Sequence, residues 1–178
     1  MKNLIISNDT WIQTYTGKAF NFLNPQEELI DIEDISIGLN NIYRFTGQTN
    51  YKYTVAIHSI IVSMLVPFEF KIYGLLHDAT EAYLGDINSP LKRCLPEYRK
   101  IEKNLHEAIM NKFNLKTEIP QIVKDVDLKL LFTEKRDLFK HKLDWSNEVE
   151  PYTFNTLDII EEVKNIDFLE MFKLLYRK

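Results

Sequence analysis

Residues 74–86 read GLLHDATEAYLGD. The run sets His77 and Asp78 side by side among apolar residues and adds two more carboxylates, those of Glu81 and Asp86. If the run is helical, His77 and Glu81 are four residues apart and share one face. Burying such polar groups without partners is costly. We therefore expect either that a metal ion binds these polar groups or that their burial destabilises the core.

Length and composition restrict the class of protein. A chain of 178 residues is long enough for a single domain, over 1–178, with a core of its own. Its net charge is −4, from 22 basic and 26 acidic residues without a basic block, which argues against a nucleic-acid partner. The single cysteine, Cys94, excludes an internal disulfide and a cysteine zinc cluster. Any metal must then be bound by histidine and carboxylate.

The sequence carries no signal for a membrane or for secretion. No apolar run approaches the ~20 residues that cross a bilayer, and the first residues lack the long apolar segment of a signal peptide. We therefore expect a cytoplasmic protein without a membrane partner.

Hydrophobic periodicity predicts an all-α bundle of about six helices behind an irregular N-terminal arm. In the arm, residues 10–23 mix aromatics and threonines around Gly17, which favours a short hairpin. Residues 85–90 are expected to form a polar loop that ends one of the helices. Helices are expected over about 31–44, 54–65, 68–84 and 96–113, from 121 through 134, and over 155–176.

Three of these helices carry an ionisable group where the periodicity requires an apolar residue. They are His58, the pair His77 and Asp78, and Asp127. Two imidazoles and two carboxylates form a plausible coordination shell for Zn²⁺, Mn²⁺, Fe²⁺ or Co²⁺. Each has a plainer explanation, because a lone histidine on an apolar face is more often hydrogen-bonded in the core and a buried aspartate often pairs with a base. Their convergence in an otherwise aliphatic bundle favours the metal.

The helix that carries Asp127 holds two further carboxylates of interest. Asp125 points roughly 200° away from Asp127 at about 100° per residue, so we expect it to be solvated. Glu134 lies two turns beyond Asp127 on the same face. It either supports a metal ligand or caps neighbouring backbone groups, and the sequence leaves both open.

The order His58, His77-Asp78, Asp127 on successive helices resembles the HD-domain phosphohydrolase superfamily. Within it, HDATE at 77–81 followed by Gly85-Asp86 is similar to the bacterial 5′-deoxynucleotidases. Longer strings resemble phage-associated members still more, among them the dATP triphosphohydrolases of phages that replace adenine with diaminopurine. These strings are IEDI at 32–35, YRF at 43–45, YTVAIHS at 53–59 and LLHDATEAYLGDINSPLKR at 75–93. The resemblance covers about residues 17–134 and implies an HD-type helical bundle.

The resemblance also implies roles for particular side chains around a divalent metal. Glu81 would orient or deprotonate the attacking water, or assist the leaving oxygen. Asp86 would lie beside the sugar and the metal water. The implied metal ligands are His58, His77, Asp78 and Asp127.

Four more residues are implied as substrate contacts. Arg44 corresponds to the family's arginine upstream of the first ligand, where its planar fork suits a phosphate; the plainer alternative is that it neutralises a helix C-terminus. Phe45 stands where the deoxynucleotidases commonly carry tryptophan, a departure that bears on its sugar-sensing role. Lys92 and Lys18 are further expected phosphate contacts, although Lys92 taken alone is an ordinary surface charge.

Together these features predict a metal-dependent enzyme that hydrolyses deoxynucleotides between the 5′ oxygen and the α-phosphorus. The preferred substrate is a dNTP, dATP above all, with deoxynucleoside and triphosphate as products. The alternatives are a 5′-deoxynucleotidase acting on dNMPs, a non-catalytic HD module that binds metal or nucleotide, and a purely structural helical protein. The expected cofactor is Zn, Co, Mn or Fe, with additional Mg²⁺ on the phosphates. The resemblance further implies a homo-oligomer.

Overall fold

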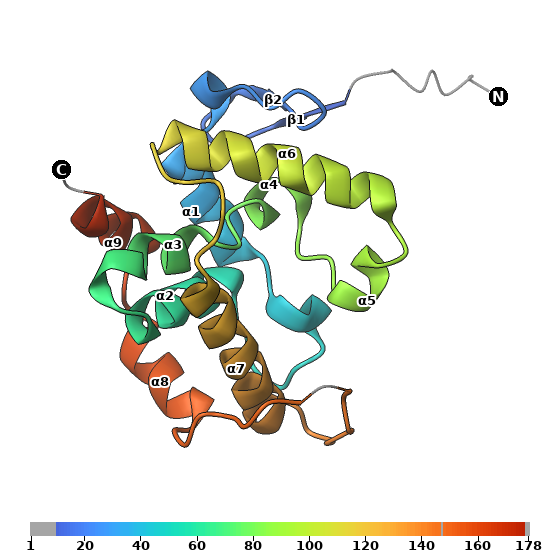
Figure 1. Cartoon of the computed structure of the whole chain (residues 1–178), viewed down its shortest axis with the longest axis vertical. Coiled ribbons are helices and arrows are strands. Elements are labelled where there is room, and N and C mark those ends of the chain that lie inside the picture. Colours follow the sequence, from blue (N-terminus) through green and yellow to red (C-terminus); the bar gives the residue numbers. More distant parts are fainter. Residues whose placement is uncertain (1–9, 147, 177–178) are drawn as a thin grey trace.

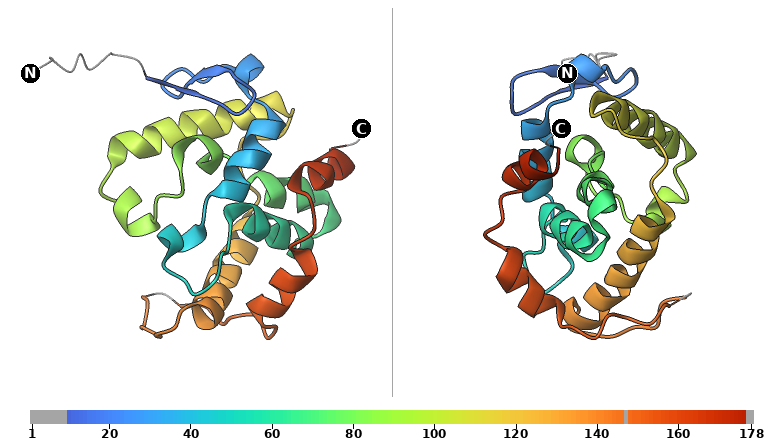
Figure 2. Two further views of the ribbon diagram at one scale, coloured as in Figure 1. Left: turned by 180° about the vertical axis from the view of Figure 1, so that it is seen from behind. Right: turned by 60° about the vertical axis from the view of Figure 1, so that its left-hand side comes forward.

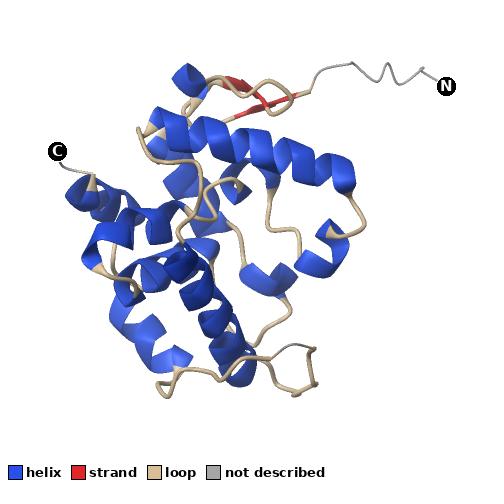
Figure 3. Cartoon of the chain, viewed as in Figure 1, coloured by secondary structure: helices blue, strands red, loops and turns tan. Residues whose placement is uncertain are grey.

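The computed structural model describes residues 10–146 and 148–176 (Figure 1). These residues form α-helices, a few short 3-10 turns and one small hairpin, so the expected all-α class is confirmed (Figure 3). Within them, no helix combines the length and the apolar character that crossing a membrane requires.

The N-terminal arm is a two-stranded antiparallel hairpin. Strands β1 (Trp11–Gln13) and β2 (Ala19–Asn21) pair with Ile12 opposite Phe20. The turn between them contains Gly17 at a φ of +83°, a conformation that glycine adopts without steric cost. The fully buried ring of Phe20 stacks on Tyr83 and fixes the hairpin to the helices. The expected hairpin around Gly17 is therefore confirmed.

Helix α1 (Ile32–Asn41) ends earlier than its periodicity suggests. Asp31 caps its start by accepting a hydrogen bond from the backbone N–H of Glu33. The helix was expected to end near residue 44, but the chain becomes extended at Ile42. The reason is tertiary, because the Ile42 carbonyl accepts a hydrogen bond from the Val55 N–H at 3.0 Å. The 3-10 turns are η1 (Glu27–Leu29) before α1 and η2 (Arg44–Gly47) after it.

Helix α2 (Val55–Leu65) is the central element, as its almost entirely buried sequence indicates. It packs against α1, against α3 (Lys71–Leu76), and against the later helices α7 (Gln121–Leu138), α8 (Thr156–Val163) and α9 (Phe168–Leu175). The approach of α3 depends on Gly74. A Cβ atom at Gly74 would lie 2.9 Å from the Cα atom of Ser63, so only glycine permits this crossing.

The expected single helix over 68–84 is wrong, because the chain is interrupted there. It consists of the 3-10 turn η3 (Phe68–Phe70), helix α3, a tight turn at 77–80, and the short helix α4 (Glu81–Leu84). At the break, the Nδ1 atom of His77 lies 2.8 Å from the Gly74 carbonyl, which in a continuous helix would accept the N–H of Asp78. The turn therefore fixes the His77 ring with a carbonyl that would otherwise continue the helix.

The next helices agree better with the periodicity. The expected polar loop at 85–90 is wrong in part, because helix α5 (Ser89–Lys92) occupies its end. Asn88 caps this helix by accepting a hydrogen bond from the Leu91 N–H. Helices α6 (Pro96–Lys112) and α7 (Gln121–Leu138) are confirmed. Asp125 on α7 is exposed, as expected.

The expected closing helix over 155–176 is also wrong. It is two helices, α8 (Thr156–Val163) and α9 (Phe168–Leu175), and Figure 2 shows them as separate rods. Asp167 begins the second helix by accepting a hydrogen bond from the Glu170 N–H. The break lets Val163 and Phe168 both reach the core, where each is 1% exposed. The bundle thus has more and shorter helices than expected.

Candidate metal centre

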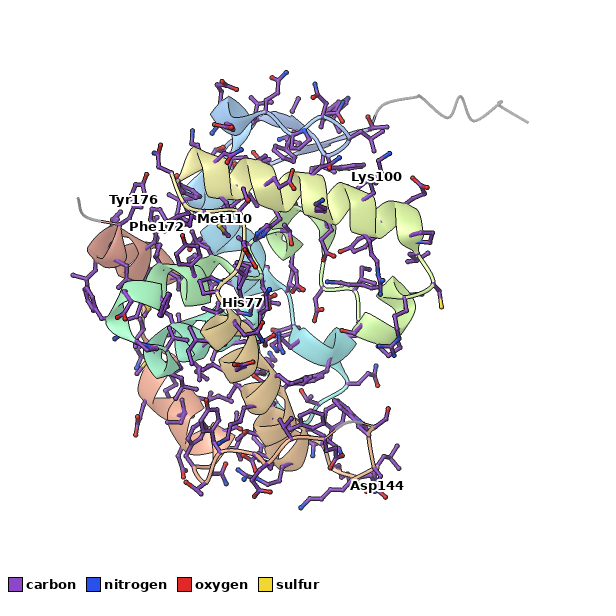
Figure 4. All side chains as sticks on the ribbon, viewed as in Figure 1. His77, Lys100, Met110, Asp144, Phe172 and Tyr176 are labelled. Carbon is purple, nitrogen blue, oxygen red and sulfur yellow. The ribbon has the colours of Figure 1, made fainter. Side chains whose placement is uncertain are left out.

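The predicted ligands from three helices meet at one point. His58 comes from α2, His77 from the end of α3 and Asp127 from α7, and Figure 4 labels His77 close to α7. One ligand atom from each of the three residues lies within 4.8 Å of the other two. These side chains could therefore hold a metal ion together.

Two of the three separations between these atoms are those expected of groups that share one ion. Two ligand atoms about 2.1 Å from an ion lie roughly 3.0 to 3.4 Å apart when the angle between them is about 90° to 109°. His58 Nε2 lies 3.3 Å from His77 Nε2 and 3.0 Å from Asp127 Oδ1. The distance from His77 Nε2 to Asp127 Oδ1 is longer, 3.8 Å. Two imidazoles and a carboxylate at this spacing could hold a metal ion.

Both imidazoles are fixed so that the same nitrogen faces the cluster. His77 Nδ1 lies against the carbonyl of Gly74, which only accepts, so this nitrogen carries the proton. His58 Nδ1 lies 2.6 Å from the Glu134 carboxylate and donates to it in the same way. Each Nε2 then faces the centre, where it can carry a proton beside the carboxylates. Without that proton it could bind a metal ion, as in metal-binding histidines whose other nitrogen is held by an outer partner.

The charges of the cluster attract a cation. Burial alone would lower the pKa of His77, but the carboxylates of Asp78 and Asp127 outweigh burial and raise this pKa well above 6.5. Burial would raise the pKa of Asp127, yet its hydrogen bond with His58 and the charge of nearby His77 hold this pKa well below 3.8. Both shifts have one meaning: the pocket stabilises positive charge between these side chains.

Asp78, the fourth predicted ligand, lies beside the trio. Its Oδ2 atom is 3.2 Å from His77 Nε2 and 3.8 Å from His58 Nε2. The same oxygen accepts a hydrogen bond of 3.3 Å from Arg44 Nη1. Asp78 is therefore shared between the candidate metal position and a buried arginine.

Arg44 lies inside the site. It is 9% exposed and forms ion pairs with Asp78 and, at 3.2 Å, with Glu134. In the described part of the chain its Nε atom is buried without a hydrogen-bond partner. These two carboxylates, and not a helix C-terminus, are what the structure places against its charge.

Glu81 and Asp86, the predicted catalytic acids, lie close enough to Asp78 for its charge to affect theirs. Glu81 begins α4 and is 5% exposed; burial, with repulsion from Asp78 and Asp86, raises its pKa well above 4.5. Its Oε2 atom, like Arg44 Nε, has no hydrogen-bond partner among the described residues. Burial also raises the pKa of Asp86, against the opposing charge of Arg44.

The two predicted lysines are engaged by carboxylates. Lys92 Nζ lies 2.6 Å from Glu102 and 3.5 Å from Glu81, so it borders the site as part of an ion-pair network. Lys18 pairs at 2.8 Å with Asp31, between the hairpin and the start of α1. The structure thus places Lys92 at the site and Lys18 in the arm.

Phe45 borders the site through Arg44, whose guanidinium lies over the Phe45 ring, 5.4 Å from the ring centroid. Its ring packs edge-on against Phe139, with centroids 5.1 Å apart, and lies near Trp145. Phe45 and Thr46 both have φ near +55°, the left-handed region that is costly for residues with a side chain. This strained turn carries Arg44 into the site while the ring of Phe45 packs against the segment after α7.

The sequence left the role of Glu134 open, although this residue bonds to Arg44, Tyr53 and His58. Glu134 is fully buried and accepts hydrogen bonds from Tyr53 Oη and His58 Nδ1, both at 2.6 Å. A carboxylate two turns from a predicted ligand, on the same buried face, was the signal. Tyr53 was missed because nothing in its local sequence distinguishes it from a core aromatic. Glu102 was missed because it lies on a charged helix.

The sequence of this chain is similar to those of known proteins. No protein-family model matches it. It is 33% identical over 124 residues to an uncharacterized protein of Rhodobacter capsulatus, a match that covers 64% of this chain and 63% of that protein. It is 43% identical over 129 residues to the uncharacterized protein YfdR of Escherichia coli K12, with 72% of each chain covered. The chain therefore belongs to the same family as YfdR.

Proposed function

We propose that this protein is a metal-dependent phosphohydrolase of the HD-domain type that cleaves deoxynucleotides between the 5′ oxygen and the α-phosphorus. The observation that carries the proposal is the convergence of the two His Nε2 atoms with Asp127 and Asp78, beside the buried Glu81. The order of these residues along the chain resembles the HD superfamily, which supports the choice of reaction.

His58, His77, Asp127 and Asp78 would hold the cation. Zn²⁺, Mn²⁺, Fe²⁺ and Co²⁺ all accept such mixed nitrogen and oxygen ligands. A divalent metal bound there would polarise a phosphoryl oxygen and make water a better nucleophile near neutral pH.

The chain's own residues can manage the proton and the phosphate. Hydrolysis joins a water oxygen to phosphorus and breaks the bond from phosphorus to the 5′ oxygen, which must gain a proton. Glu81 holds a proton more readily than an ordinary carboxyl because burial raises its pKa. The unpartnered Nε–H of Arg44 supplies a charged donor for a phosphate oxygen. Arg44 Nε and Glu81 Oε2 both lack a hydrogen-bond partner among the described residues, and a substrate and its water would supply one to each.

Two substrate classes follow from different observations. Resemblance to the phage group favours a dNTP, with dATP preferred and triphosphate released. The ion pairs favour the second candidate, a 5′-deoxynucleotidase acting on dNMPs, because Arg44, Lys92 and Lys18 are all held by carboxylates. A triphosphate would need these cations more than a monophosphate does.

A nucleotide panel tests the proposal. The purified protein is incubated with each dNTP and dNMP in Mn²⁺, Co²⁺ or Zn²⁺, with and without Mg²⁺, and products are identified by chromatography. Release of deoxynucleoside with triphosphate supports the first candidate, and cleavage of dNMPs alone supports the second. If the protein binds metal stoichiometrically but cleaves no nucleotide, the enzyme hypothesis is refuted and a non-catalytic binding module is supported. Absence of bound metal leaves the structural protein.

A further inference from the structure

One carboxylate connects both halves of the site. Glu134 lies on α7 two turns beyond Asp127, and its side chain is 0% exposed. Burying a carboxylate costs several kcal/mol unless its oxygens are paired and hydrogen-bonded. Each oxygen of Glu134 is so paired, and the partners belong to different parts of the site.

The two oxygens divide the partners between them. Oε1 accepts from His58 Nδ1 and from the hydroxyl of Tyr53, both at 2.6 Å. Oε2 accepts from Arg44 Nη2 at 3.2 Å. One rigid buried group therefore orients a candidate metal ligand on one side and the candidate phosphate-binding arginine on the other.

We infer that Glu134 is a positioning residue that sets the affinity for the metal through His58 and the placement of Arg44 through the same carboxylate. Tyr53 assists by holding Oε1 in place. The part that concerns Arg44 and phosphate rests on the proposed function, whereas the part that concerns the metal does not. Carboxylate partners of metal-binding histidines typically change metal affinity by 10- to 100-fold when removed.

The test is a metal titration of the full chain after removal of metal with a chelator. Glu134→Gln keeps the size of the side chain and removes its charge, and Tyr53→Phe removes one hydrogen bond. Ser63→Ala is the matched control, because Ser63 is also fully buried on α2 and donates a hydrogen bond, to the Lys71 carbonyl. Binding of Co²⁺ and of Zn²⁺ is measured by calorimetry in the absence of nucleotide.

The inference expects Glu134→Gln to weaken metal binding by roughly 10- to 100-fold and Tyr53→Phe by less, with Ser63→Ala unchanged. Equal affinities of wild type and Glu134→Gln would overturn it. Equal losses in Glu134→Gln and Ser63→Ala would also overturn it, because the effect would then follow stability. Wild-type protein that binds neither ion overturns the inference as well.

Activity measured on the same samples separates this inference from the proposed function. At saturating metal, Glu134→Gln is expected to raise the KM of whichever nucleotide is cleaved, because Arg44 loses one of its two anchors. An unchanged KM overturns the part that concerns Arg44. A weakened metal site in Glu134→Gln, in a protein that cleaves no nucleotide, supports the positioning role and refutes the proposed function.

Discussion

At the scale of single residues, the site is held ready before any ligand binds. His58 and His77 are each fixed at Nδ1, by Glu134 and by the Gly74 carbonyl. Their Nε2 atoms cannot turn away without losing a buried hydrogen bond, which costs about 1 to 3 kcal/mol. Because these side chains are already ordered, little free energy is lost to fixing them when a metal binds.

Asp127 is the ligand whose removal should be cleanest. Its side chain is 38% exposed, so Asp127→Ala is expected to leave the fold intact while it lowers metal affinity by at least 10-fold. Asp125→Ala, two residues away on the exposed face of α7, is the control. Metal content after dialysis and circular dichroism check both. Equal metal content in the two variants would remove Asp127 from the ligand set, and the same result in His58→Ala would remove His58.

Glu81 should separate chemistry from metal binding. Because Glu81 lies beside the cluster and outside the group of three close ligands, Glu81→Gln is expected to keep the metal. The same variant is expected to lower kcat by roughly 10²- to 10⁴-fold, the usual contribution of a general acid or base. Glu107→Gln, on the surface of α6, should change neither. A Glu81→Gln variant with wild-type kcat would assign proton transfer to another group.

At the scale of elements, close helix crossings and caps determine where the ligands lie. Helix α3 reaches α2 only because Gly74 has no side chain, and the carbonyl of Gly74 also holds His77. Gly74→Ala is expected to destabilise the protein by about 1 to 3 kcal/mol, since the added Cβ meets backbone atoms of Ser63 that cannot give way. Thermal and urea unfolding measure this change. Unaltered stability would mean that the crossing is looser than the structure shows.

The junction of α7 and α8 predicts a dependence of stability on pH. Asp137 Oδ2 accepts from the N–H and the hydroxyl of Thr156, at 2.7 and 2.9 Å. Burial would raise the pKa of Asp137, but its hydrogen bonds with Arg136 and Thr156 hold the pKa below the ordinary 3.8. The folded state therefore prefers the ionised form. This stabilisation is complete above about pH 4 and is lost as pH falls through the lowered pKa.

Asp137→Asn should accordingly reduce the free energy of unfolding by about 1 to 2 kcal/mol at pH 7. The difference from wild type should shrink as the pH falls below about 4, where the wild-type carboxyl becomes protonated too. Urea unfolding at several pH values tests this. A difference that is constant over the whole range would show that the ionised carboxylate is not what stabilises the junction.

At the scale of the whole molecule, periodicity predicted the ligands better than the boundaries of the helices. His58 and Asp127 were found because each interrupts an apolar stripe, and a stripe depends only on local spacing. The break at 77–80 forms where His77 Nδ1 lies against the Gly74 carbonyl, and the break at 164–167 ends at the Asp167 cap. An apolar stripe does not contain such side-chain hydrogen bonds. Glu134 remained open for the same reason, since its partners are 76 to 90 residues away.

Self-association remains a prediction from the resemblance. Light scattering on the purified protein decides it, with a homo-oligomer expected. A strictly monomeric mass would contradict it without touching the metal site, because the ligands assembled here come from one chain.

The most direct test of the central claim is a metal titration of chelator-treated protein with nucleotide hydrolysis followed throughout. We expect no hydrolysis of the dNTP and dNMP panel before metal is added. Hydrolysis should then rise with Mn²⁺, Co²⁺ or Zn²⁺ and level off near one ion per chain. Undiminished hydrolysis without metal, or one bound ion per chain without hydrolysis of any nucleotide, would contradict the central claim.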